Sequence, residues 1–219
     1  MDTRKIIDFL KKLKKNNNKE WFDAHRKEYD EIKKYHLDLV NEFIARISKF
    51  DKTIASVTAK ECVFRINRDI RFSNDKTPYK THIGAFIIEG GRKNWKCGYY
   101  VHLEPNNSII ACGLHIPNSE WLYKARIAIS DRGEELIKLL NRPTYKRFFG
   151  EFEGEKLKSV PRDFDKNSKY IELIKLKSFD IVYSYNDKDV FKEDTFINDV
   201  IEKFKILKPI NDFFNKALN

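Results

Sequence analysis

The densest group of chemically capable side chains lies between Phe64 and His82. This stretch of nineteen residues holds three arginines, two lysines, two aspartates, a tyrosine and a histidine. The arginine guanidinium is a planar fork that can bind two oxygens of a phosphate or carboxylate at once. The stretch therefore predicts an anion-binding site. Its candidate ligand-binding residues are Arg65, Arg68, Arg71, Asp75, Lys76, Tyr79, Lys80 and His82.

The spacing of the three arginines leaves two interpretations open. Arg65, Arg68 and Arg71 are three residues apart, so they would alternate between faces on a strand but could converge in a loop or helical turn. Asp69 and Asp75 could then orient the arginines or act as acid–base groups. The alternative is a salt-bridged network that ties the sheet to a helix and binds nothing.

A second polar group follows from strand alternation. In the expected strand Lys96–Glu104, successive side chains point to opposite faces. Tyr100, His102 and Glu104 then share one face, and apolar residues occupy the other. Tyr100 joins the candidate ligand-binding set. Histidine titrates near neutral pH and a carboxylate can tune it, so His102, Glu104 and Asp69 are the candidate catalytic residues.

Motifs for metals and common cofactors are missing from the sequence. His102-Leu-Glu104 is similar to the His-x-Glu of zinc deaminases, but the partner Pro-Cys-x-x-Cys is absent. There is no phosphate-binding P-loop, dinucleotide-binding glycine motif, nucleophile elbow or His-Glu-x-x-His. We therefore expect no metal site and no cofactor. The three widely spaced cysteines, Cys62, Cys97 and Cys112, are expected to be buried free thiols in a reducing cytoplasm.

The charge of the chain bears on its partners. The net charge is +10, and residues 1–150 carry 30 Lys and Arg against 19 Asp and Glu, a net +11. A basic excess attracts anionic small molecules or nucleic acid. A lysine-rich solvated surface is the alternative. No apolar run approaches the ~20 residues of a membrane span, and no signal peptide is evident, so we expect a cytoplasmic protein without membrane contact.

The periodicity of apolar residues predicts helices at both ends of the chain. A short helix carries Ile6, Ile7, Leu10 and Leu13, and a long one runs from about Lys19 to about Lys49. Further helices are expected after Ser119, after Asp131 and after Pro143. A long C-terminal helix begins near Asp194 and kinks at Pro209.

The middle of the chain predicts a mostly antiparallel sheet. Five strands are expected, at Glu61–Ile66, Ile83–Glu89, Lys96–Glu104, Ser108–His115 and Ser178–Tyr185. Short, turn-rich links join three of them into a meander, and no linker or repeat divides the chain. Residues 1–219 are thus expected to form a single α+β domain, with helices flanking the sheet.

Several segments, in order, resemble the motifs of one protein family. They are Asn16–Phe22, Phe64–Thr81, Gly98–Pro105, Glu155–Pro161 and Leu176–Phe179. The family is the largely bacterial group known as domain of unknown function 2461. Within the central motif, Asn67 stands where a tyrosine is common and Asn74 where a lysine is common. The resemblance implies a soluble single-domain protein and assigns no catalytic residue.

These observations leave three hypotheses for the function. The first is a protein that binds a phosphate-bearing or other anionic ligand, with His102 and Glu104 as its acid–base groups if it is an enzyme. The second is a nucleic-acid-associated protein that uses its basic residues 1–150. The third is a non-catalytic interaction or structural module whose charged motif is a buried ion-pair network.

Overall fold

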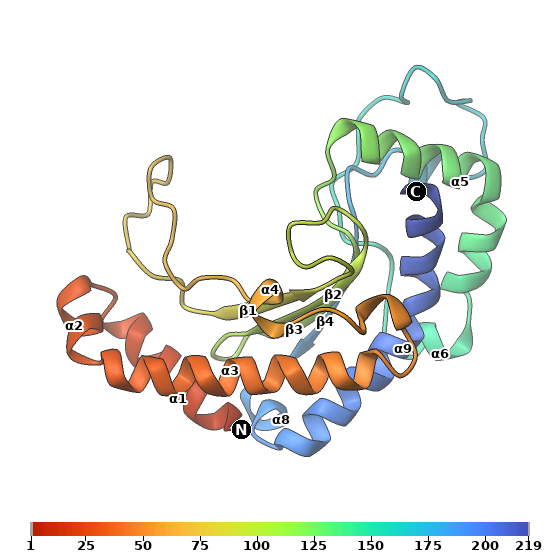
Figure 1. Ribbon diagram of the computed structural model, residues 1–219. Helices are drawn as coiled ribbons and strands as arrows, with labels where there is room; N and C mark the ends of the chain where they lie inside the picture. Colours follow the sequence, from red (N-terminus) through yellow and green to blue (C-terminus); the bar gives the residue numbers. More distant parts are fainter. Residues whose placement is uncertain (1, 219) are drawn as a thin grey trace. The chain divides into compact units, whose positions relative to one another are not determined.

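The chain folds into α-helices and one β-sheet. The computed structural model describes residues 2–218 (Figure 1). Within these residues there are nine α-helices, one short 3-10 helix and one antiparallel sheet of four strands in the order β1-β2-β3-β4. The strands are β1 (Ile83–Ile87), β2 (Gly98–Leu103), β3 (Ser108–Leu114) and β4 (Phe179–Tyr185). The predicted α+β class is confirmed, with a long helix near each end.

Two compact units divide the chain. The first comprises Met1–Asn94, Tyr100–Ile110 and Ser184–Ile201. The second comprises Trp95–Tyr99, Ala111–Tyr183 and Glu202–Asn219. The boundaries cross β2, β3 and β4, so each of these strands has residues in both units.

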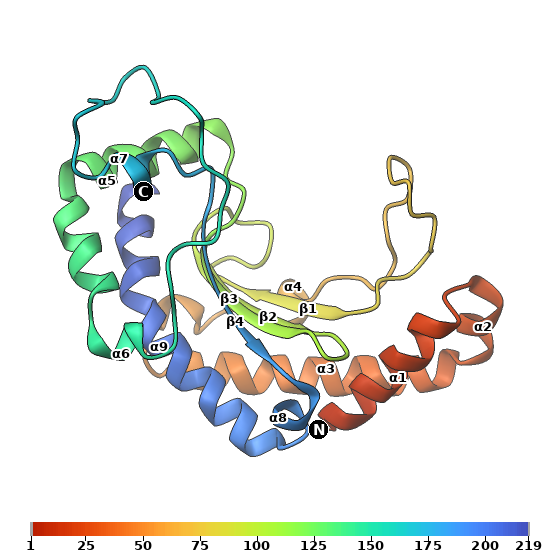
Figure 2. The same ribbon diagram turned by 180° about the vertical axis from the view of Figure 1, so that it is seen from behind.

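The first unit contains five helices from the N-terminal part of the chain and one from later in the sequence. They are α1 (Thr3–Lys15), α2 (Lys19–Ala24), α3 (Arg26–Ile47), η1 (Lys52–Ile54), α4 (Ala59–Cys62) and α8 (Asp187–Val190). The predicted apolar stripe of α1 is buried, and α1 packs against α3. Thr3 Oγ1 donates to the Val190 carbonyl at 2.7 Å, so α8 lies beside the start of α1 (Figure 2).

The predicted helix from Lys19 to Lys49 is broken at His25. This residue has φ −105° and ψ 19°, and it separates α2 from α3. Its ring stacks on that of Trp21 with centroids 4.0 Å apart, and its Nδ1 lies 2.8 Å from the Trp21 carbonyl oxygen. The imidazole thus forms a hydrogen bond with a carbonyl oxygen at the end of α2, and this bond stabilises the break between the two helices.

The expected strand at Glu61–Ile66 is wrong, and the sheet has four strands instead of five. The segment begins as helix α4, because Thr58 and Glu61 form a reciprocal capping box. The chain then meets the sheet only briefly, through an isolated bridge from Val63 to Ala85 and a hydrogen bond from the Phe64 amide to the Gly84 carbonyl at 3.0 Å. The Thr-x-x-Glu signature was visible in the sequence, but the apolar run after it favoured a strand.

The second unit contains α5 (Ser119–Leu140), α6 (Pro143–Lys146) and α7 (Ile171–Ile174), and α5 contacts both of the shorter helices. The sequence predicted two helices where α5 is one. At the boundary predicted between the two, α5 has a kink at Arg132, with φ −125° and ψ 22°. Asn118, rather than Ser119, caps its start by accepting from the Trp121 amide at 2.9 Å.

Helix α9 (Glu193–Leu218) holds Pro209 in its interior, as predicted, and carries a buried apolar stripe. Asn211 lies on this helix and is 2% exposed. It accepts from the Gly113 amide at 3.0 Å and donates to the Gly98 carbonyl at 2.9 Å. Asn215 bonds both backbone groups of Cys97 in the same way. Two amides thus satisfy buried main-chain groups near the ends of β2 and β3.

No helix within residues 2–218 is both long enough and apolar enough to cross a membrane. All three cysteines are free and buried, as the sequence predicted.

Removal of the Asn211 amide tests its structural role. We expect Asn211→Ala to lower the free energy of unfolding by about 2–4 kcal/mol, because two buried backbone groups lose their partner. Denaturant unfolding measures this change. The control is Asn141→Ala, an exposed position that ends α5, which should stay within about 0.5 kcal/mol of the wild type. Equal, small losses in both variants would contradict the assignment.

Candidate functional site

Main-chain hydrogen bonds close the polar segment into a loop. The Lys80 amide donates to the Ile66 carbonyl at 2.8 Å, and the Arg68 amide donates to the Pro78 carbonyl at 2.9 Å. Asn67 and Tyr79 form an antiparallel bridge between them. Both ends of the loop therefore lie side by side, although many residues separate them in the sequence.

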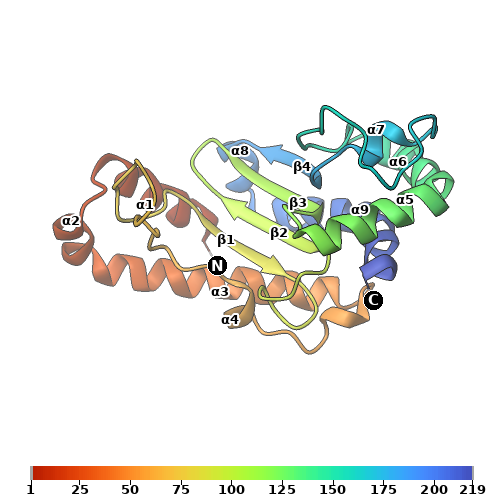
Figure 3. The same cartoon turned by 90° about the horizontal axis from the view of Figure 1, so that it is seen from above.

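The loop is anchored to the N-terminal helices through Tyr79. Asn17 donates from Nδ2 to the Tyr79 carbonyl at 2.9 Å and accepts from the Tyr79 amide at 3.1 Å. The Tyr79 ring stacks on Phe22 with centroids 4.0 Å apart. Asn17 thus pairs with the Tyr79 backbone as a neighbouring strand would. This anchor holds the base of the loop over the α1–α2 connection (Figure 3).

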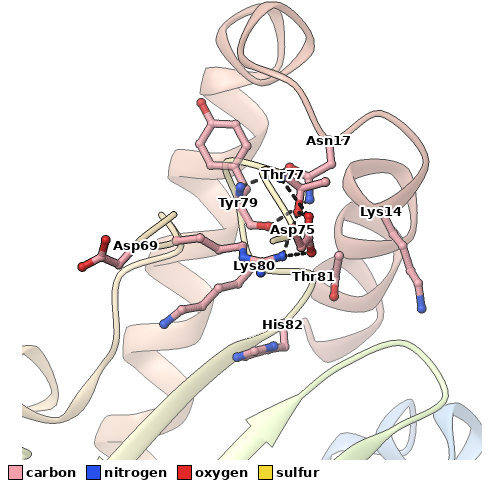
Figure 4. Close-up of a pocket in the computed structure, with 10 residues that line it drawn as sticks. Lys14, Asn17, Asp69, Asp75, Thr77, Tyr79, Lys80, Thr81 and His82 are labelled. Atoms are coloured by element: carbon pink, nitrogen blue, oxygen red, sulfur yellow. Dashed lines mark hydrogen bonds and ion pairs between the residues drawn. The ribbon is translucent and has the colours of Figure 1, made fainter. Parts of the chain in front are cut away.

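A cavity of about 470 Å³ lies at the base of this loop. Polar side chains dominate its wall, and Figure 4 shows Asp75, Thr77 and Asn17 gathered together, with Asp69 and Lys14 on opposite sides. The lining residues are Lys14, Asn17, Arg68, Asp69, Asp75, Thr77, Tyr79, Lys80, Thr81 and His82. Five predicted ligand-binding residues and one predicted catalytic residue, Asp69, therefore share one cavity.

Arg68 is held in this wall by local partners. Its Nη1 pairs with the Asp75 carboxylate and donates to Thr77 Oγ1 at 2.8 Å. Asp75 also accepts from the Thr77 amide and hydroxyl at 2.9 and 2.8 Å. These hydrogen bonds from Thr77, with that from Arg68, lower the pKa of Asp75 to about 2. Asp75 therefore orients the guanidinium, which keeps further N–H donors for a ligand.

The three arginines do not converge. Arg71 pairs with Asp69, with Nη2 to Oδ2 at 2.6 Å and Nε to Oδ1 at 2.9 Å, and its side chain is 74% exposed. Arg65 is exposed. Lys76 donates to the Ile70 carbonyl at 3.0 Å, within the loop. Arg65, Arg71 and Lys76 are thus absent from the cavity wall, because they serve the loop or face solvent.

Lys80 is the cation that the fold partly withdraws from water. Burial lowers its pKa, and repulsion from Arg65 lowers it further. Its Nζ lies 5.5 Å from the centroid of the Phe64 ring. Among residues 2–218 no carboxylate pairs with it.

The predicted polar face of β2 adjoins the cavity through His82. Gly84 lies against Tyr100, and the His82 ring stacks on His102 with centroids 4.1 Å apart. His102 Nδ1 is 3.0 Å from Tyr100 Oη, and its Nε2 is 3.3 Å from Glu104 Oε2. The β1–β2 register thus joins one residue of the loop segment to three residues of the strand.

Gly84 makes room for this arrangement. A Cβ atom at this position would lie 2.9 Å from Tyr100 Oη and 3.3 Å from its ring. A larger residue would therefore push the tyrosine from its place beside His102.

Burial and hydrogen bonds set the protonation states of the group formed by His82, Tyr100, His102 and Glu104. Burial lowers the pKa of His82 to about 4, helped by repulsion from His102. It also lowers the pKa of His102, against the opposing effect of the hydrogen bond that His102 donates to Glu104, and raises the pKa of Tyr100 to about 12. Burial would raise the pKa of Glu104, but hydrogen bonds from Asn107, Thr81 and His102 together lower it. At pH 7 the group holds two neutral imidazoles, a carboxylate and a neutral phenol.

Four lining residues were missed by the sequence analysis. Thr77 and Thr81 lie within the central motif, but hydroxyls were not counted among its ligand groups. Asn17 lies in the Asn16–Phe22 segment that carries the family resemblance, which was the available signal. Lys14, on α1, had no signal at all, because its proximity is a matter of tertiary packing.

Two histidines whose pKa values shift in opposite directions, His82 and His115, make a testable prediction. NMR titration of the metal-free protein should place the pKa of His82 at about 4. His115 should titrate above its ordinary 6.5, because its hydrogen bond to Asp180 stabilises the charged form. Between pH 4 and pH 6.5, the pKa values of His82 in the folded and unfolded states, the folded state binds fewer protons at His82 than the unfolded state does. This histidine's contribution to stability is thus present above pH 6.5 and is lost as the pH falls towards 4.

Assignment of the His82 signal uses His82→Gln, which removes one resonance and leaves the His115 titration unchanged. A His82 pKa near 6.5 would contradict the burial described here.

Comparison with known proteins places the chain in a family. Searches of curated proteins and of solved structures found no match. A family model described as a conserved hypothetical protein, domain of unknown function 2461, matches residues 5–213. Because this match spans nearly the whole chain, the protein belongs to the domain of unknown function 2461 family.

Proposed function

We propose that this protein binds a phosphate-bearing or other anionic small molecule in the cavity lined by Arg68 and Lys80. The observation that carries the proposal is Lys80, a half-buried cation in the cavity wall that lies near Arg65. Burial lowers the pKa of Lys80, and repulsion from Arg65 lowers it further. Within the described part of the chain neither makes an ion pair with a carboxylate. An anion at Lys80 would relieve this repulsion and supply the missing partner.

The charge of the cavity wall supports the same ligand class. The wall carries three cations, Lys14, Arg68 and Lys80, and two carboxylates. Asp75 is neutralised by Arg68, and Asp69 by Arg71. The volume of about 470 Å³ falls within the range of small-molecule sites. The excess positive charge therefore favours a small anion.

His102 and Glu104 supply an acid–base pair if the ligand is a substrate. A neutral imidazole at hydrogen-bond distance from a carboxylate is suited to take up a proton. Asp69 is less suited, because its carboxylate is engaged by Arg71. Catalysis thus belongs to the strand face, while the cations bind and orient the ligand. A cytoplasmic location is part of the proposal, supported by three free cysteines.

The ion pairs of the loop do not support a buried structural network. The side chains of Arg68 and Asp75 are 27% and 54% exposed, and those of Arg71 and Asp69 are 74% and 46% exposed. Pairs at such exposure contribute about 0–1 kcal/mol to stability. Arg68 can therefore be replaced without unfolding the protein, which makes a binding experiment interpretable.

Thermal shift is the first experiment, with inorganic phosphate, sugar phosphates and nucleotides. A ligand at ~100 times its Kd adds roughly 2.7 kcal/mol, and each kcal/mol moves the Tm by about 2–4 °C at this size. Calorimetry of the best ligand should then show affinity at least about tenfold weaker in Arg68→Ala and Lys80→Ala, because a charged hydrogen bond contributes about 1.5–3 kcal/mol.

Lys27→Ala, at an exposed position on α3, is the matched control and should bind as the wild type does. Wild-type affinity in both Arg68→Ala and Lys80→Ala would refute the proposed site.

A second candidate, association with single-stranded nucleic acid, is favoured by Phe72. This side chain is 95% exposed, and the Arg71 guanidinium lies 5.7 Å from its ring centroid. Exposed aromatic rings beside cations stack on bases. Binding of short DNA or RNA should then weaken steeply with salt and drop in Phe72→Ala. Salt-independent binding, or equal binding by Phe72→Ala, would exclude this candidate.

A further inference from the structure

His82, His102 and Glu104 form a second cluster with its own chemistry. One nitrogen from each imidazole and one carboxylate oxygen all lie within 4.8 Å of one another. Within residues 2–218 this is the one group of three histidine, cysteine or acidic side chains so placed. The three residues come from two segments, and the β1–β2 register brings them together.

The distances suit a small divalent ion. Ligand atoms held ~2.0–2.2 Å from a tetrahedral ion lie roughly 3.3–3.6 Å from each other. His102 Nε2 and Glu104 Oε2 are already 3.3 Å apart. His82 stacks on His102 at an interplanar angle of 23°, so its ring must tilt out of the stack for its nitrogen lone pair to point at the same ion.

The surroundings resemble an outer ligand shell. Tyr100 Oη is 3.0 Å from His102 Nδ1 and so leaves Nε2 directed at Glu104. Thr81 Oγ1 donates to Glu104 Oε1 at 2.9 Å, and Asn107 Nδ2 donates to Oε2 at 3.0 Å. Such partners fix the ring orientation of a ligating histidine and the position of a ligating carboxylate.

The ligand types indicate the class of metal. Two imidazoles and one carboxylate suit zinc and other first-row divalent ions, whereas magnesium and calcium prefer oxygen ligands alone. Three protein ligands leave a coordination position open to water or to an oxygen of another molecule. His82 also lines the cavity, so an ion held here would be reached from it.

We infer that His82, His102 and Glu104 bind a first-row divalent transition metal ion, with zinc as the preferred occupant. The inference revises the expectation of no metal site. It goes beyond the proposed anion binding and does not depend on it, because the three ligands include neither Arg68 nor Lys80. A metal ion bound here would replace the acid–base pairing of His102 with Glu104.

The test uses the full chain, stripped with a chelator and titrated with Co²⁺ and Zn²⁺ without any added anion. We expect one equivalent of Co²⁺ to bind, with visible absorption bands of a four- or five-coordinate ion, and Zn²⁺ to displace it. His82→Ala, His102→Ala and Glu104→Gln should each weaken binding at least tenfold. Tyr100→Phe should weaken it by about 10–100-fold, as outer-shell changes do.

His115→Ala is the matched control. His115 also faces a carboxylate, with Nδ1 3.1 Å from Asp180 Oδ2, but no third ligand joins them. This variant should bind the metal as the wild type does. Absence of stoichiometric binding by the wild type, or equal binding by the three ligand variants, would overturn the inference.

X-ray absorption at the zinc edge of the wild-type protein keeps the inference testable if the variants do not fold. Scattering from two imidazoles and light-atom ligands is expected, and sulfur scattering would overturn it by placing the metal at a cysteine. Anion binding is measured separately in the stripped protein. Metal binding without anion binding would refute only the proposed function, and the reverse result would refute only the metal site.

Discussion

Main-chain pairing between Ile66 and Lys80 is the constraint on which the rest of the site depends. It brings the start and end of a long polar loop together, so that Arg68 and Lys80 contribute to one cavity wall. Strand β1 begins directly after the closure. The same pairing therefore carries His82 to the edge of the sheet, where the register with β2 places it against His102.

Partial burial gives this arrangement its chemical character. Charged groups interact more strongly where water is reduced, and the fold partly withdraws Lys80, His82 and His102 from solvent. The lysine stays without a carboxylate partner within the described chain, while the imidazoles are held neutral. The cations of the cavity wall thus lie close to a cluster of two imidazoles and a carboxylate, which His82 joins to the cavity.

Local sequence patterns predicted the features of the fold that depend on residues close together in the sequence. Alternation placed Tyr100 and His102 on one half-buried face of β2, with Glu104 directly after the end of the strand, because side chains of any strand alternate. Apolar spacing predicted α1 and α9. The same reasoning failed at Glu61–Ile66, where a four-residue capping box outweighed the tendency of the following residues to form a strand. It also failed at His25, whose side chain competes for a helix carbonyl.

The sequence by itself determined the kinds of side chain available, the α+β class and the family. These follow from the composition of the chain and from patterns among residues that are close together in the sequence. Tertiary structure alone decided which of these side chains meet. Arg71 turned to its neighbour Asp69, whereas Arg68 entered the cavity wall, and Asn17 reached Tyr79 from another helix. His82 meets His102 only through the register of two strands. A one-residue slip would send every side chain of a strand to the opposite face, and no local pattern specifies that register.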